Sequence, residues 1–252
     1  MVDGGCGAGP VAIGSQTEPI DVAEGSETGE TVPVSESPPT SFADLRQDYL
    51  VGALNEGEVD ADPFTQFRRW FDDASAVHVP GTDEPHAMTL ATVLDGQPMT
   101  RTVLLKGLDS RGFVWFTNYA SQKGRALAVE PRAALTFYWG RLERQVNVVG
   151  RVERVTVEES DEYFRSRPVG SRIGAIVSAQ SSVIENRGVL ETAAAELAEI
   201  PETELRRPPT WGGFRLIPAS IEFWQGRPSR LHDRLRYRLA PDSAWVIERL
   251  AP

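Results

Sequence analysis

Short segments with strand character follow one another through the middle of the chain and constrain its fold more than any other feature. Between residues 87 and 155 they lie at 87–94, 99–106, 113–118, 133–139 and 143–155. Asp95-Gly96, between the first two, is a signal for a tight hairpin. Further candidates follow at 213–217, 220–225, 233–239 and 244–249. Many short antiparallel strands with few helices between them predict a barrel-type, mainly β (α+β) domain and not alternating βαβ units.

A few helices are expected around these strands. Ser41 is suited to begin the first one as an N-cap. Residues 64–76 place aromatic side chains at helical spacing directly after Asp62 and Pro63. Shorter helices are predicted at 121–130, 157–166 and 185–199. Neither of the two common glycine-rich phosphate loops occurs, so any phosphate would have to be held by side chains.

Composition places the chain among ordinary soluble proteins. Of its 252 residues, 40% are hydrophobic and 25% are charged. No run approaches the roughly 18 apolar residues of a membrane span, and the N-terminus lacks the features of a secretory signal. Cys6 is the only cysteine, which excludes an internal disulfide and a thiolate metal cluster. We therefore expect a cytoplasmic protein.

The acidic charge is concentrated at the N-terminus. Residues 1–40 contain seven acids and no Lys or Arg, and removing these acids from the net charge of −10 leaves −3 for residues 41–252. The same segment is rich in Gly, Pro, Ser, Thr and Glu and lacks aromatic residues, so we expect a disordered acidic tail over 1–40. The rest shows no basic surplus that would indicate nucleic-acid binding.

The segment R-L-H-D-R near the C-terminus gathers positive charge. If it is extended, Arg230, His232 and Arg234 share one face, while Leu231 and Leu235 point to the other. Such a face suits an anionic or electron-rich ligand. The alternative is a solvated edge strand.

Two further segments could hold a phosphate. Arg101 and Lys106 stand at the two ends of an apolar strand, but their parity is opposite, so they reach one ligand only if the strand bulges or ends before Lys106. Lys123 follows a predicted helix start, where backbone N–H groups favour anions. Solvated strand ends and an ordinary capped helix are the respective alternatives.

Three hydroxyl and guanidinium groups also converge at a helix end. Tyr163 and Arg167 are one turn apart, and Ser171 follows the break at Pro168, which together suit a phosphomonoester. A surface helix pair is the alternative. Gln145 places an amide in an apolar strand, where it serves either a heterocyclic ligand or a structural hydrogen bond. No His spacing supports a metal site.

Ten segments in order resemble the pyridoxine/pyridoxamine 5′-phosphate oxidase family. They are LRQDY (45–49), DPFTQFRRWF (62–71), RTVLLKG (101–107), FTN (116–118), LERQVNVVGRVERV (142–155), YFRSRPVGSRIGAIVSAQSS (163–182), WGGFR (211–215), IEFWQG (221–226), RLHDR (230–234) and ERLAP (248–252). The resemblance covers essentially all of 41–252 and none of 1–40. It implies an FMN-binding split β-barrel oxidase domain over 41–252, with a C-terminal dimerisation and substrate region, acting as a homodimer with two sites at the interface.

The resemblance also implies roles for individual residues. FMN would be bound by Arg101, Leu104, Lys106, Phe116, Thr117, Gln122, Lys123, Gln145, Gln180, Ser181, Trp224 and Arg234. The phosphorylated substrate would be bound by Arg46, Tyr49, Lys106, Tyr163, Arg167, Ser171, Arg230 and His232. Arg230 and His232 would lie over the pyridine ring as the catalytic pair.

The implied reaction is the FMN-dependent oxidation of pyridoxine or pyridoxamine 5′-phosphate to pyridoxal 5′-phosphate. Oxygen is the acceptor, and the products include hydrogen peroxide and, from the amine, ammonia. A related flavin oxidase acting on a phenazine-type ring and a non-catalytic flavin- or pyridoxal-phosphate-binding protein are the alternatives. The three hydroxyl and guanidinium groups at 163, 167 and 171 favour a phosphorylated substrate.

Two positions depart from the family pattern. Many members have Arg-Lys where this chain has Gln122-Lys123, and an aromatic hydroxyl common before Thr117 is replaced by Phe116. Exchanging a charged contact for a neutral one costs about 1–2 kcal/mol of FMN binding. We therefore predict weaker FMN retention in this chain.

Overall fold

The computed structural model describes residues 41–45 and 48–252 of a chain that divides into two units, Met1–Arg46 and Gln47–Pro252. In the first unit a short 3-10 helix, η1 (Phe42–Asp44), begins at Ser41, whose hydroxyl accepts a hydrogen bond from the Ala43 N–H. This confirms Ser41 as an N-cap. The predicted tail over 1–40 lies outside the described residues. All that follows concerns the second unit.

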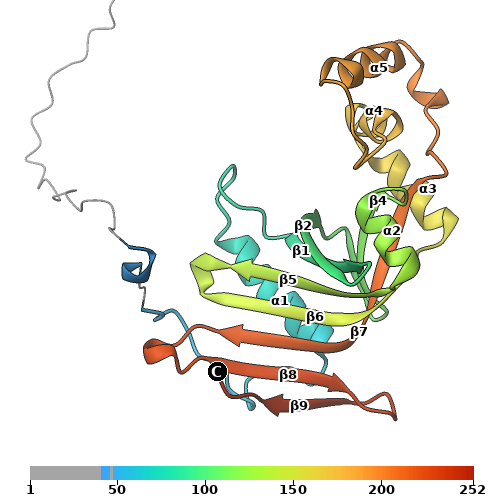
Figure 1. The fold of residues 1–252 in the computed structure, drawn as a ribbon. Coiled ribbons are helices and arrows are strands. Elements are labelled where there is room, and N and C mark those ends of the chain that lie inside the picture. The colour runs from blue at the N-terminus through green and yellow to red at the C-terminus, as the bar shows by residue number, and fades with distance from the viewer. Residues whose placement is uncertain (1–40, 46–47) are drawn as a thin grey trace, which may run out of the picture. The chain divides into compact units, whose positions relative to one another are not determined.

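The second unit is built on an antiparallel sheet that has nine strands in its described part (Figure 1). The strand order is β2-β1-β5-β6-β7-β4-β3, with β8 paired to β7 and β9 to β8. The strands are β1 (Ala87–Leu94), β2 (Gln97–Leu104), β3 (Gly107–Asp109), β4 (Gly112–Asn118), β5 (Arg132–Trp139), β6 (Arg144–Arg154), β7 (Trp211–Gln225), β8 (Asp233–Leu239) and β9 (Trp245–Arg249). The expected mainly β architecture is confirmed.

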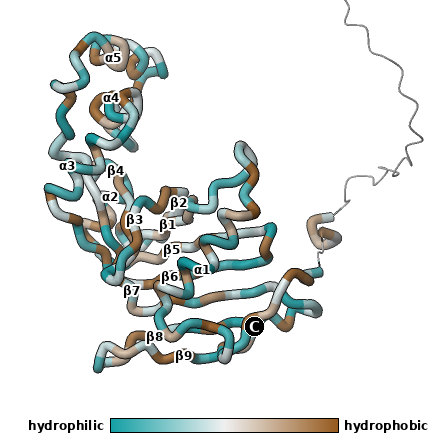
Figure 2. Tube along the Cα trace, turned by 180° about the vertical axis from the view of Figure 1, so that it is seen from behind, coloured by the Kyte–Doolittle hydropathy of each residue, from teal (hydrophilic) through white to brown (hydrophobic). Residues whose placement is uncertain are grey.

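Helices and 3-10 turns connect or cover these strands. The helices are α1 (Pro63–Ala76), α2 (Gln122–Val129), α3 (Val157–Ser166), α4 (Val169–Val177) and α5 (Gly188–Ala198), and the turns are η2 (Gly140–Leu142), η3 (Glu202–Glu204) and η4 (Pro228–Arg230). Asp62 caps α1 by accepting from the N–H groups of Phe64 and Thr65. Helices α4 and α5 pack on each other, and both carry hydrophobic segments (Figure 2). Within the described residues no helix is long and apolar enough to span a membrane.

The core forms where α1 lies on the sheet. Phe67 is almost fully buried and packs edge-on against Phe113 of β4 and Phe137 of β5, with ring centroids 5.0 and 4.9 Å away. Trp70 packs in the same way on Phe223 of β7. Each such side chain contributes about 1.5–3 kcal/mol of burial free energy, so the aromatic spacing in 64–76 fixes the face that α1 presents to the sheet.

The predicted elements differ most from the structure in β7 and in the helices α4 and α5. The segments 213–217 and 220–225 form one continuous strand, β7, because the break at Pro218 is absorbed by a register shift opposite Val149 and Gly150 of β6. Such a shift tolerates a proline, which lacks the N–H that a regular ladder needs. Helix α4 was not predicted, and the helix predicted at 185–199 is shorter, as α5.

The condition under which Arg230, His232 and Arg234 would share one face, an extended R-L-H-D-R segment, is not met. Ser229 and Arg230 both have a positive φ, 58° and 62°, within and at the end of the turn η4, and β8 begins only at Asp233. Side chains therefore do not alternate between Arg230 and His232. Leu231 is 71% exposed, whereas Leu235 is fully buried, so these two leucines do not share a face.

Candidate functional site

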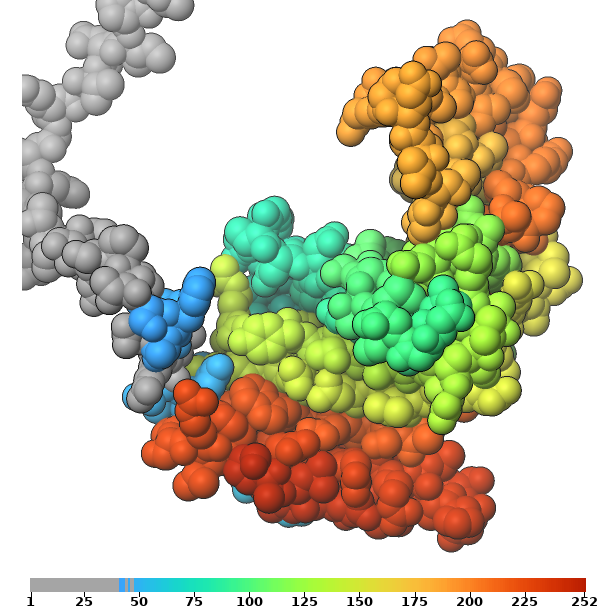
Figure 3. Space-filling view, viewed as in Figure 1, coloured from blue at the N-terminus to red at the C-terminus, as the bar shows by residue number. Residues whose placement is uncertain are grey.

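A cavity of about 750 Å³ opens between the strand ends and the α3–α4 segment. In Figure 3 the golden-orange helical segment overhangs the green surface formed by residues near 100–125. The volume lies within the range of ligand and cofactor sites. We call it the basic cavity; its walls are formed by Thr100, Arg101, Thr102, Val103, Leu104, Lys106, Phe116, Thr117, Asn118, Gln122, Lys123, Tyr163, Arg167, Ser171, Gly174, Ala175, Ser178, Gln180, Ser181 and Trp211.

The charges that line this cavity all have one sign. Arg101, Lys106, Lys123 and Arg167 contribute four cations, and no Asp or Glu is among the described lining residues. This is unusual in a chain whose net charge is −10. Because clustered cations repel one another, such a site is stabilised when an anion enters it.

Lys123 is the most deeply buried of the four cations. Its Nζ donates to Thr117 Oγ1 at 3.2 Å, Gln180 Oε1 at 3.0 Å and Ser121 Oγ at 3.4 Å, all of them neutral acceptors. Burial, and after it the nearby Arg101, lowers the pKa of Lys123 to about 8. An anion in the cavity would counter both effects and restore the charged form.

Arg101 and Lys106 reach the cavity in spite of their opposite parity. Strand β2 ends at Leu104, so Lys106 lies beyond the regular alternation, where its N–H donates to the Val114 carbonyl. Arg101 donates through Nη1 to the Leu90 carbonyl and to Thr92 Oγ1. Burial lowers the pKa of Arg101. The condition set by the sequence, a strand that ends before Lys106, is met.

The helix α3 brings a second group to the same cavity. Tyr163 stacks on Phe116 with ring centroids 3.9 Å apart, and the Arg167 guanidinium lies 4.8 Å from the ring centroid of Trp211. The Nη1 atom of Arg167 is buried without a hydrogen-bond partner in the described structure. Burial lowers the pKa of Arg167 and raises that of Tyr163. A donor left unpaired in this way points to a ligand acceptor.

The start of α2 is held in place by neighbouring residues of the cavity. Ser121 caps the helix by accepting from the Gly124 N–H, and the Gln122 N–H donates to Ser181 Oγ at 3.2 Å. Gln180 Oε1 also accepts from Thr117 Oγ1 at 3.0 Å. The segment after α4 therefore contacts the start of α2, where the sequence predicted a phosphate-binding site.

The other predicted site residues lie elsewhere. Tyr49, Trp224 and His232 form what we call the aromatic corner: Tyr49 packs edge-on against Trp224 and His232, with centroids 5.6 and 5.5 Å away. Gln145 lies opposite Trp224 in the β6–β7 pairing. None of these four residues lines the basic cavity.

Two arginines beside the aromatic corner differ in their partners. Arg234 forms an ion pair with Glu222 at 2.8 Å and donates to the Ala251 carbonyl at 2.9 Å. Arg230 is exposed at the end of the η4 turn. His232 Nδ1 accepts from the Arg227 N–H at 3.1 Å, so the neutral ring carries its proton on Nε2. Arg46 lies outside the described residues.

Sequence reasoning missed part of the cavity wall. Trp211, which stacks on Phe116 and underlies Arg167, was quoted only within the WGGFR segment. Asn118 was likewise quoted only within FTN; it is buried and donates to the Ser178 carbonyl at 3.3 Å. An aromatic residue directly before two glycines is the signal that could have identified Trp211, because the glycines leave room for Phe116 and Tyr119 against the strand.

Comparisons with known proteins found two matching family models and close relatives. The family model described as pyridoxamine 5′-phosphate oxidase matches residues 76–200, and the one described as the pyridoxine 5′-phosphate oxidase C-terminal dimerisation region matches 211–252. A pyridoxine/pyridoxamine 5′-phosphate oxidase of Cupriavidus taiwanensis is 57% identical over 214 residues, covering 84% of this chain and 100% of the relative.

Two solved structures have the same fold. PhzG from Burkholderia lata 383, in complex with tetrahydrophenazine-1-carboxylic acid, is 31% identical, with a TM-score of 0.74 over 80% of this chain and 99% of that chain. A pyridoxamine 5′-phosphate oxidase-related, FMN binding protein from Nostoc punctiforme is 17% identical, with a TM-score of 0.61 over 77% of this chain and 100% of that chain. The expected split β-barrel with flanking helices is confirmed.

Proposed function

Because the chain belongs to the pyridoxine/pyridoxamine 5′-phosphate oxidase family, we propose that it oxidises pyridoxine or pyridoxamine 5′-phosphate to pyridoxal 5′-phosphate with FMN as cofactor. Oxygen takes up the electrons as hydrogen peroxide, and the amine substrate also consumes water and releases ammonia. The observation that carries this proposal is the basic cavity, whose four cations face no carboxylate among the described lining residues. A phosphorylated cofactor together with a phosphorylated substrate would neutralise them.

The residues of the cavity fit FMN. Lys123 is a buried cation held only by neutral acceptors, and Arg101 stands beside it. We assign the cofactor phosphate to these two cations, with the α2 start at Gln122 and Ser181 beside it. Thr117, Gln180 and Leu104 line the same cavity. When bound, FMN supplies the redox chemistry, taking a hydride from the substrate and passing electrons to oxygen.

The substrate phosphate is assigned to the part of the cavity that is lined by residues of α3 and α4. Arg167 offers a buried Nη1 that has no partner in the described structure, and the hydroxyls of Tyr163 and Ser171 line the cavity beside it. Lys106 can approach from the end of β2. We call Tyr163, Arg167 and Ser171 the phosphate clamp. It holds the substrate by its phosphate, which takes no part in the oxidation, and so contributes to substrate binding.

The aromatic corner would complete the site from a second copy of the chain. Trp224 follows Trp211 by thirteen residues in the continuous strand β7, so at roughly 3.3 Å per residue the two lie up to about 40 Å apart. Figure 1 shows β7 crossing the unit from the α3 side to the β8 side. One mononucleotide does not bridge that separation within one chain. The match to a C-terminal dimerisation region supports a homodimer with two shared sites.

Arg230 and His232 would then act on the ring of a substrate bound to the other chain. Arg230 is exposed at the η4 turn and can polarise the ring hydroxyl. His232 presents Nε2–H, since Nδ1 is engaged by the Arg227 N–H, and can donate a hydrogen bond to the substrate. Gln145, Trp224 and Arg234 are assigned to the cofactor side, and Tyr49 with Arg46 to pocket closure.

The alternatives differ in the ligand they require. A phenazine-type oxidase is supported by the likeness to PhzG at 31% identity. That interpretation does not account for the buried, unpaired Nη1 of Arg167, which lies in the same cavity as the hydroxyls of Tyr163 and Ser171. A phosphomonoester would accept hydrogen bonds from all three groups. A non-catalytic binding protein would not need Arg230 and His232 together.

Peroxide release by the FMN-loaded protein tests the proposal. We expect turnover with pyridoxine or pyridoxamine 5′-phosphate and none with a reduced phenazine carboxylate; the reverse preference would replace the proposed substrate, and FMN binding without any turnover would refute catalysis. Arg230→Ala should lower kcat by at least about 100-fold with full FMN content, as expected for loss of a group that acts on the reacting ring. Arg238→Ala, on the nearby strand β8, is the matched control and should keep full activity.

A further inference from the structure

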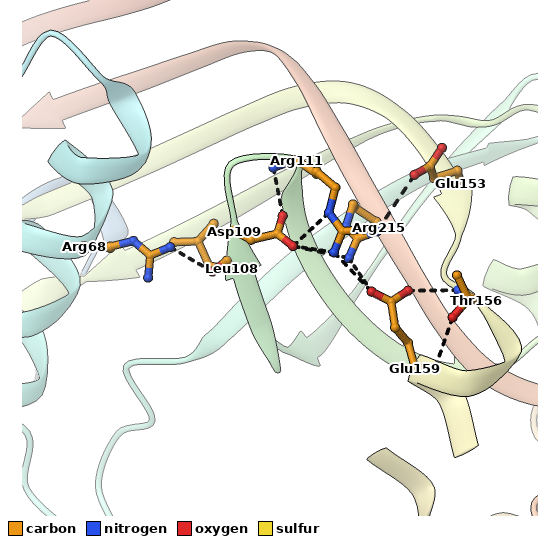
Figure 4. A network of polar contacts seen from close by, with 8 residues as sticks. All are labelled: Arg68, Leu108, Asp109, Arg111, Glu153, Thr156, Glu159 and Arg215. Atoms are coloured by element: carbon orange, nitrogen blue, oxygen red, sulfur yellow. Dashed lines mark hydrogen bonds and ion pairs between the residues drawn. The ribbon is translucent and has the colours of Figure 1, made fainter. Parts of the chain in front are cut away.

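A network of ion pairs joins β7, α3 and the turn between β3 and β4 (Figure 4). At its centre is Arg215 of β7, which is 4% exposed. Its Nη2 lies 3.0 Å from Glu159 Oε1 and 3.5 Å from Asp109 Oδ2. Arg111 contacts the same two carboxylates, at 3.2 and 2.6 Å. None of these four residues lines the cavity.

Glu159 also closes the start of α3. Its Oε2 accepts from the Thr156 N–H at 2.9 Å, and its own N–H donates to Thr156 Oγ1 at 3.1 Å, which together form a capping box. One carboxylate therefore caps the helix with one oxygen and binds β7 with the other. Ser160 adds a second tie, since its Oγ accepts from the Gly213 N–H at 3.2 Å.

This anchored helix carries the phosphate clamp. Tyr163 lies four residues after Glu159 and Arg167 eight residues after it, so all three share one side of α3 and of its end. Tyr163 stacks on Phe116, and Arg167 lies over Trp211, the residue at which β7 begins. Helix α3 is thus fixed to β7 at Arg215 and meets the same strand again at Trp211.

The exposed fractions of the side chains show which residue of the ion-pair network is buried and which are solvated. The side chains of Asp109 and Glu159 are 41% and 33% exposed, so water can solvate them if the arginine is removed. Arg215 is 5% exposed in its side chain, and its Nε is buried without a partner in the described structure. A well-packed apolar residue at this position would stabilise the fold as well or better, so stability alone does not account for the buried arginine.

We propose that Arg215 is a positioning residue for the phosphate clamp: through Glu159 it sets the orientation of α3 and so the placement of Tyr163 and Arg167. This inference rests on the proposed function of the cavity. The phosphate contacts bind the substrate equally in its ground state and its transition state, so a small displacement of the binding groups weakens substrate binding and leaves the ring chemistry unchanged. Loss of Arg215 therefore raises KM and leaves kcat nearly constant.

The test compares Arg215→Met with the FMN-loaded wild type. We expect KM for pyridoxine 5′-phosphate to rise about tenfold, with kcat within about twofold and FMN content unchanged. Arg215→Lys should recover part of the KM. Arg132→Met is the matched control and should leave KM unchanged. It removes an exposed ion pair between Arg132, at the start of β5, and Glu130.

A double-mutant cycle with Glu159→Gln separates positioning from general destabilisation. If Arg215 acts through Glu159, the double variant should raise KM by no more than the larger single effect. Independent multiplication of the two effects would overturn the proposal, as would a lower unfolding temperature with unchanged KM. If Arg215→Met does not fold, the single variant Glu159→Gln can be used for the same KM measurement.

Binding of pyridoxal 5′-phosphate, measured by calorimetry, distinguishes failure of this inference from failure of the proposed function. Weaker binding in Arg215→Met supports positioning even if the wild type turns over no B6 vitamer. Unchanged binding refutes positioning even if the wild type is fully active.

Discussion

The basic cavity and the β8–β9 hairpin use arginine in opposite ways. On the hairpin Arg236 and Arg249 each meet a carboxylate at 2.6 Å, provided by Glu248 and Glu56. Hydrogen bonds from these arginines lower the pKa of Glu248 and bring that of Glu56 to about 2. In the cavity Lys123 and Arg167 have no carboxylate within their described contacts, and burial lowers their pKa values.

The difference separates charge that serves the fold from charge kept for a ligand. Exposed ion pairs contribute little to stability, typically below about 1 kcal/mol each, and their loss is tolerated. Buried cations without counterions cost the folded state free energy, which is recovered only when an anion binds. A substitution in the cavity should therefore weaken ligand binding and stabilise the ligand-free protein, whereas one on the hairpin should leave ligand binding unchanged and should not stabilise the protein.

Of the substitutions in the two regions, Arg167→Met in the cavity should have the larger effect on activity. We expect kcat/KM for pyridoxine 5′-phosphate to fall about 30-fold, corresponding to the roughly 2 kcal/mol of a charge-assisted hydrogen bond. Unphosphorylated pyridoxine should show no such loss. The unfolding temperature of the FMN-free protein should rise, because a buried unpaired charge is removed.

Arg236→Met on the hairpin provides the contrast for that experiment. It should leave kcat/KM unchanged and should not raise the unfolding temperature. The comparison between the two regions fails if Arg167→Met lowers activity equally for phosphorylated and unphosphorylated substrate, or if both variants shift stability in the same direction.

Lys123 should make FMN binding depend on pH. Its pKa in the folded chain is about 8 against an ordinary value of 10.5, so the free site loses its charge as the pH rises through 8. A phosphate monoester is already dianionic above its second pKa of about 6. Between pH 7 and 9 the FMN dissociation constant should therefore rise about tenfold, followed by flavin fluorescence.

The same shift has a defined sign for folding. Because the unfolded chain binds more protons at Lys123 between pH 8 and 10.5, this group makes the FMN-free protein more stable as the pH rises through that window. Lys123→Met should bind FMN about tenfold more weakly at pH 7 and should flatten the dependence on pH. A variant that retains the wild-type pH profile would assign the titration to another group.

Gln122→Arg should give the smallest change. The Gln122 N–H donates to Ser181 Oγ at the start of α2, and an arginine at position 122 would add a cation there. FMN affinity should increase about fivefold, which corresponds to about 1 kcal/mol, the lower end of the deficit expected from a neutral residue. Equal retention of FMN by the two proteins in gel filtration would show that this chain compensates for its glutamine.

The sequence predicted the strands of the barrel well because their alternation and hairpin signals are local. Strands 87–94 and 233–239 have the bounds observed for β1 and β8. Of the predicted site, the residues between 101 and 181 that the motifs named lie around one cavity, apart from Gln145. Their convergence depends on how β2, β4 and α3 meet in space, which no local pattern contains.

Other features could not be read from the sequence for physical reasons. Helix α4 lies between Pro168 and Ser178 with Gly170 and Gly174 inside it, a composition that favours a loop. The turn at Ser229 and Arg230 needs a positive φ at two residues that seldom adopt one, so nothing in the sequence indicated it and the segment was considered as an extended one. Neither conformation is indicated by a local sequence pattern.

The strand β7 joins the two halves of the proposed shared site within one polypeptide, since it begins at Trp211 beside the phosphate clamp and ends next to the aromatic corner. Each chain would thus give its clamp to one ligand and its corner to another. Two defective alleles, one damaged at Arg167 and the other at Arg230, could then restore activity when their products assemble together. A mixed dimer would hold one site with both lesions and one with none.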